Sequence, residues 1–143
     1  MLTFLQAVTY WCMVFGTDKN QTHWKHLSSN KKLSTSFKRS LFAQTSLNEA
    51  TWSKYWKSMI TFRNEYAAHR SLHSTPPVPF LDCALEVAYS YDRWVREIIS
   101  PDIFEEPLLK DSAVDLQRLI KPVVRELLSA PAANRRSREQ QLS

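Results

Sequence analysis

The chain of 143 residues contains one glycine, Gly16, and this scarcity limits the folds that it can adopt. A sheet protein of this length needs many tight turns, and those turns favour glycine or Asn-Gly pairs. Hydrophobic residues make up 43% of the chain and aromatic residues 12%, which argues against general disorder and suffices for the core of one domain. We therefore predict an all-α fold, an antiparallel bundle of four to five helices that forms one domain over residues 1–129.

The strongest helical pattern runs over residues 46–72. Ser46 and Glu49 have the spacing of a capping box, which predicts that a helix begins there. Large side chains then recur every three or four positions, as on the buried face of an amphipathic helix: Trp52, Tyr55, Trp56, Met59, Phe62 and Tyr66. The rest of the chain is expected to pack around this helix.

Four further helices are predicted from apolar spacing and from stop signals. Gly16 is expected to end the first of them, Pro101 to end the fourth, and Pro122 to kink or break the last. The connector HSTPPVP is too rich in proline to continue either a helix or a strand. The predicted helices, apart from the central one, cover residues 2–15, 33–44, 80–100 and 110–129, with one helical turn at 23–27.

The two ends of the chain and its cysteines give weaker signals. Residues 130–143 have no apolar period and are predicted to be a disordered basic tail. The apolar start lacks a basic segment and a small-residue cleavage site and is too short to span a bilayer, so we expect a cytoplasmic protein without a membrane segment. Because no cap precedes this apolar start, a helix before residue 1 is a further hypothesis. Cys12 and Cys83 lie among apolar neighbours and are expected to be buried thiols in a reducing compartment.

Charge is distributed unevenly along the chain. Residues 1–75 contain ten Lys and Arg against three Asp and Glu, a net charge of +7, whereas residues 76–129 contain six against ten, a net charge of −4. Residues 130–143 contain three against one. A basic amino-terminal half suits a partner that carries phosphate, although a merely solvated basic surface is the alternative.

His23, Trp24 and His26 lie close together in a polar loop. Two histidines three residues apart are compatible with a metal site, but no cysteine or acidic residue stands at a ligand spacing. The preferred interpretation is that Trp24 packs the loop onto the core and that the histidines surround it. We predict neither a metal nor a cofactor.

The segment FRNEYAAHR, residues 62–70, combines three side chains suited to phosphodiester chemistry. The guanidinium of Arg63 can bind phosphate oxygens in a bidentate manner, His69 can exchange a proton near neutral pH, and Asn64 can orient either one. On one straight helix Arg63 and His69 lie about 120° apart around the axis and about 9 Å apart along it. They would meet on one phosphate only if the helix were distorted near Ala67–Ala68 or if two copies met across a two-fold axis.

This motif, an arginine followed by a polar residue and then by a histidine near the end of a long helix, resembles that of the HEPN superfamily. RNEYAAH together with the upstream WCMVFGTDKNQTHWKHL resembles its abortive-infection branch in particular, over most of residues 1–100. The resemblance implies a homodimer whose paired Arg–His motifs form a cleft that cuts RNA without metal, in a toxin–antitoxin or antiphage system. Arg63 would stabilise the phosphorane, His69 would act as general acid or base, and Asn64 would be the polar residue after the arginine. Ser71 departs from the tyrosine that some HEPN toxins have at this position.

Two other functions remain open from the sequence. One is a catalytically inactive HEPN-like module for dimerisation or adaptor binding, suggested by five tryptophans that would suit an interface. The other is non-specific nucleic-acid binding through the basic residues from Lys19 to Arg39. A further possible partner is an antitoxin or another defence protein. In the remaining alternative, Arg63 and His69 are ordinary polar groups of a helix, and Glu65 pairs with His69 one turn later.

Overall fold

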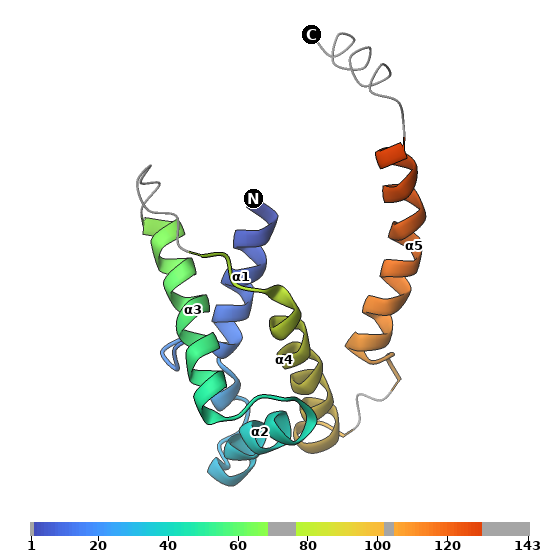
Figure 1. Cartoon of the computed structure of the whole chain (residues 1–143). Helices are drawn as coiled ribbons and strands as arrows, with labels where there is room; N and C mark the ends of the chain where they lie inside the picture. The colour runs from blue at the N-terminus through green and yellow to red at the C-terminus, as the bar shows by residue number, and fades with distance from the viewer. Residues whose placement is uncertain (1, 69–76, 102–104, 130–143) are drawn as a thin grey trace. The chain divides into compact units, whose positions relative to one another are not determined.

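The computed structural model describes residues 2–68, 77–101 and 105–129, and in these residues the regular structure is entirely helical (Figure 1). It contains five α-helices, one 3₁₀ turn and one π-helical turn. The all-α prediction is therefore confirmed for the described part of the chain. The chain divides into two compact units between Glu106 and Pro107. The single domain predicted for residues 1–129 stays a prediction, and residues 130–143 lie outside the described residues.

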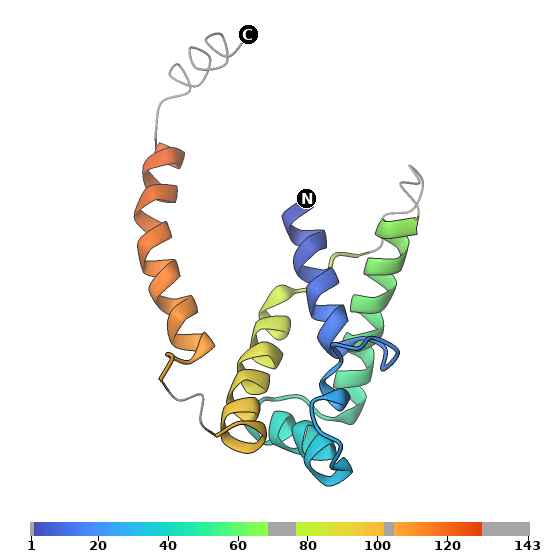
Figure 2. The same ribbon diagram turned by 180° about the vertical axis from the view of Figure 1, so that it is seen from behind.

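Helices α1 (Leu2–Phe15) and α3 (Glu49–Ala68) lie side by side and run in opposite directions (Figures 1 and 2). Helix α1 has no charged residue, so it can be covered on more than one side without burying a charge. It ends where it was predicted to end, at Gly16. A Cβ atom at this position would collide with the carbonyl oxygen of Cys12, and Trp56 Nε1 donates to the carbonyl oxygens of Phe15 and Gly16.

Helix α2 (Lys31–Gln44) packs against the 3₁₀ turn η1 (Trp24–His26) and against α4 (Leu81–Trp94). Asn30 caps α2 by accepting a hydrogen bond from the Lys32 amide, 3.0 Å long. Both η1 and α2 were expected from the sequence. Their apolar side faces the interior because Phe37 and Leu41, four residues apart, are fully buried.

The fourth predicted helix exists, but its last turn differs from the prediction. After Trp94 the helix widens into the π-helical turn η2 (Val95–Ile99), which ends just before Pro101. Arg96 in this turn is only 8% exposed. Its Nε donates to Asp92 Oδ1 at 3.0 Å and its Nη1 donates to the carbonyl oxygen of Glu106 at 2.6 Å, so the buried cation is compensated.

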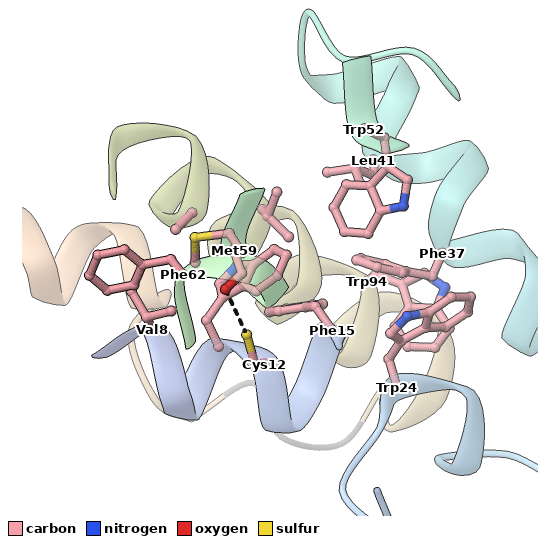
Figure 3. Close-up of a cluster of buried hydrophobic side chains, with 13 residues drawn as sticks. Val8, Cys12, Phe15, Trp24, Phe37, Leu41, Trp52, Met59, Phe62 and Trp94 are labelled. Atoms are coloured by element: carbon pink, nitrogen blue, oxygen red, sulfur yellow. Dashed lines mark hydrogen bonds between the residues drawn. The ribbon is translucent and has the colours of Figure 1, made fainter. Parts of the chain in front are cut away.

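The core of the first unit is built largely from aromatic rings (Figure 3). Phe37 lies at its centre, with ring centroids of Phe15, Trp24, Tyr91 and Trp94 between 5.0 and 5.9 Å away. Because these rings come from α1, η1, α2 and α4, one side chain joins four elements. Trp24 is 4% exposed, which confirms that it packs the polar loop onto the core.

The predicted start of α3 was wrong in its cap. The helix begins at Glu49, and Asn48 rather than Ser46 caps it. Asn48 Oδ1 accepts from the amides of Ala50 and Thr51, and the Thr51 hydroxyl accepts from the Asn48 amide in return. The sequence pattern misled because both Ser46 and Asn48 are good capping residues, and the reciprocal bond to Thr51 forms only for Asn48.

The second unit contains helix α5 (Leu109–Ser129), which continues through Pro122 without ending. The prediction of a helix here is confirmed. None of its residues is buried, although its apolar side chains recur at helical spacing. Among the described residues, no helix has the length and apolarity needed to cross a bilayer.

Candidate functional site

Arg63 and Asn64 lie on the last two turns of α3, and burial of the residue before them fixes their directions. Phe62 is 1% exposed, and its ring centroid lies 5.4 Å from that of Phe4 and 4.6 Å from that of Tyr66. Successive residues of a helix are about 100° apart. Arg63 is therefore held at the border of the buried face, half-buried, and Asn64 is exposed.

The two side chains of this pair are joined directly. Arg63 Nε and Nη2 donate to Asn64 Oδ1 at 3.2 and 2.9 Å. A guanidinium has five N–H donors in a fixed plane, and these bonds use one edge of it. The amide of Asn64 thus orients the plane of Arg63, which is the role that the sequence suggested for it.

The surroundings of Arg63 supply little negative charge. Its neighbouring helix, α1, contains no charged residue, and Glu65 lies about 200° further round the axis of α3. Burial raises the pKa of the Cys12 thiol to about 11, while the positive charge of Arg63 acts in the opposite direction. Cys12 is therefore a protonated thiol at neutral pH, and Arg63 is a cation at the edge of an apolar pair of helices. Such a cation can attract an anion from solvent.

His69 lies outside the described residues, and so does its predicted pairing with Glu65. Helix α3 remains α-helical through Ala68. The structure thus brings together two of the three predicted site residues, Arg63 and Asn64. Any approach of His69 to Arg63 depends on residues after Ala68 or on a second copy of the chain.

The histidines of the polar loop have structural roles instead of forming a metal site. His23 is 3% exposed, and its Nδ1 accepts the Lys25 amide at the start of η1. His26 Nε2 lies 2.6 Å from the carbonyl oxygen of Asp18. In the described part of the chain, no group of three or more His, Cys, Asp and Glu side chains could hold a metal ion.

A cleft of about 360 Å³ lies beside this loop, between the end of α1 and the first half of α3. Its charged side chains are paired with one another: Lys38 Nζ is 2.7 Å from Glu49 Oε1, and Lys25 Nζ is 3.9 Å from Asp18 Oδ2. Arg63 and Asn64 are not among its lining residues. Because its charges are satisfied internally, the cleft is a weaker candidate than the Arg63–Asn64 pair.

Two features of the first unit were missed by the sequence reasoning. The buried Arg96 could have been suspected from the i,i+4 spacing of Asp92 and Arg96, but nothing in that spacing indicates burial. The tryptophans were assigned to a surface, whereas four of them are in the core: Trp11, Trp24, Trp52 and Trp94. The aromatic interface on which the adaptor interpretation relied is therefore absent from these four positions.

Comparison with known proteins adds no neighbour. The chain matches no protein-family model, no curated protein and no solved structure. The HEPN resemblance therefore depends on the residues of the RNEYAAH segment and their helical context alone.

Proposed function

We propose that this chain is a metal-independent endoribonuclease of the HEPN type, acting in a toxin–antitoxin or antiphage defence system. The observation that supports it best is the orientation of Arg63 by Asn64 at the end of α3, beside a helix without charge. An oriented guanidinium at the rim of an apolar surface is suited to binding a phosphodiester.

In the proposed reaction the 2′-hydroxyl of the substrate attacks the adjacent phosphorus. A base removes the hydroxyl proton, and an acid protonates the 5′-oxygen as the P–O5′ bond breaks. The products are a 2′,3′-cyclic phosphate and a 5′-hydroxyl. His69 supplies the proton transfer and Arg63 stabilises the dianionic phosphorane, roles in which general acid–base and electrostatic catalysis each contribute about 10²- to 10⁴-fold. Two copies of the chain would contribute their motifs to one cleft.

The test is cleavage of RNA with EDTA present, comparing the wild type with Arg63→Ala and His69→Ala. We expect each variant to lose at least about 100-fold in rate, and the wild-type products to carry cyclic-phosphate ends. Lys57→Ala is the matched control, because it removes an exposed cation from the same helix. Equal cleavage by His69→Ala and the wild type would exclude the proposal.

The second candidate is a catalytically inactive HEPN-like dimerisation or adaptor module. The observation in its favour is no longer the tryptophans but the exposed apolar side chains of α5. A folded, dimeric wild type that leaves RNA intact beside a positive control would favour this function. Loss of RNA affinity with rising salt, without cleavage, would instead indicate simple electrostatic binding.

A further inference from the structure

Helix α5 carries a large apolar surface that its own unit does not cover. Its exposed apolar side chains include Leu119 at 72%, Leu128 at 73% and Leu116 at 57%. Contiguous apolar surface of this kind marks an interaction site in a folded protein. The question is what covers it.

The spacing of the apolar residues identifies the geometry of the partner. They recur at alternating intervals of four and three residues, which is the 3.5-residue period of a coiled-coil seam rather than the 3.6-residue period of a helix on a globular core. The residues of this seam, which we call the α5 seam, are Leu109, Ala113, Leu116, Ile120, Val123 and Leu127. At 1.5 Å per residue the helix of 21 residues is about 31 Å long, enough for three heptads.

Charges lie away from the α5 seam, on the opposite side of the helix. Asp115 and Arg118, three residues apart, form an ion pair of 3.3 Å there, and both side chains are exposed. Pro122 also lies outside the seam, in heptad position c when Ala113 is assigned to position a. The positions that flank the seam include Leu119 and Val124, which widen the apolar surface.

An identical helix satisfies this pattern. Positions e and g, which face each other across a coiled coil, are Lys110, Ser112, Gln117, Leu119, Val124 and Glu126. They contain one cation and one anion, so pairing α5 with itself in parallel forces no like charges together at these positions. We propose that the α5 seam is a homodimer interface, occupied by α5 of a second copy of this chain in a two-stranded coiled coil. This inference does not rest on the proposed ribonuclease activity.

The test measures association of the full chain by sedimentation over a range of concentrations. Ile120→Glu places a carboxylate in the middle of the seam, and we expect it to raise the dimer dissociation constant at least about 100-fold. Lys121→Glu is the matched control, since it introduces the same charge at the next residue outside the seam, and it should leave dimerisation within about threefold of the wild type.

A mixing experiment distinguishes pairing between chains from a folding defect. Ile120→Lys alone should also be monomeric, and mixing it with Ile120→Glu should restore a mixed dimer, because opposite charges then meet across the seam. A monomeric wild type at high micromolar concentration, or an Ile120→Glu variant that dimerises like the wild type, would overturn the inference. RNA cleavage is recorded separately, so that loss of activity in a dimeric protein counts against the ribonuclease and not against the α5 seam.

Discussion

At the scale of single residues, burial decides the chemical state of the side chains near both candidate sites. Cys12 is fully buried and donates weakly to the carbonyl oxygen of Met59 at 3.8 Å, as the dashed line in Figure 3 marks. Its raised pKa makes it a packing residue rather than a nucleophile. Arg63, one turn beyond Met59, keeps its charge at the edge of the same packed surface. A sequence that reads Cys, Met and Arg does not distinguish these roles.

His23 gives a pH prediction at this scale. Burial lowers its pKa first of all, the charges of Lys25 and His26 act in the same direction, and Asp18 and a hydrogen bond at Gly16 oppose them. The unfolded chain, with a histidine pKa of about 6.5, then binds more protons than the folded chain. Stability is therefore complete above about pH 6.5 and is lost as the pH falls from there towards the lower folded pKa.

The measurement is urea unfolding at pH 7.5 and at pH 5.5. His23→Asn keeps an acceptor for the Lys25 amide and should reduce the loss of stability between the two pH values. His26→Asn, which removes an exposed histidine of the same turn, should behave like the wild type. An unchanged pH dependence in His23→Asn would contradict the assignment.

At the scale of elements, spacing predicted the helices but not their ends. The stripe from Trp52 to Tyr66 specified α3 because a 3.6-residue period has few alternatives. The two capping residues Ser46 and Asn48 are only two positions apart, and the choice between them depends on the return bond from Thr51. Element boundaries are local competitions between similar free energies, so a pattern of residue types does not settle them.

The cap assignment is tested by two substitutions. Asn48→Ala should lower the free energy of unfolding by about 1 kcal/mol, because two backbone amides lose their acceptor. Ser46→Ala should change it by less than about 0.5 kcal/mol, as expected for an exposed residue outside the cap. Urea unfolding monitored by circular dichroism measures both, and a larger loss for Ser46→Ala would restore the original capping box.

At the scale of the whole first unit, stability depends on the ring cluster around Phe37. We expect Phe37→Ala to destabilise the protein by about 3 to 5 kcal/mol, because the cavity would loosen contacts to α1, η1 and α4 together. Phe80→Ala is the control, since that ring is 84% exposed and its loss should cost less than about 0.5 kcal/mol. Equal midpoints of urea unfolding for the two variants would contradict the central place of Phe37.

The sequence by itself determined the helical class and the approximate span of all five α-helices. Hydrophobic period and the scarcity of glycine are local properties of the chain, and they act before any tertiary contact forms. It also determined the adjacency of Arg63 and Asn64, which follows from neighbouring positions on one helix.

Only the tertiary structure decided which apolar faces are buried. Trp24 and Trp52 lie in the core, whereas Leu116 and Ile120 on an equally regular stripe remain exposed. Amphipathic spacing shows that a helix has an apolar face, but the partner of that face depends on contacts between distant segments. For the same reason the burial of Arg96 appeared only in the structure, because its acceptors are Asp92 one turn away and the carbonyl oxygen of Glu106 beyond the turn η2.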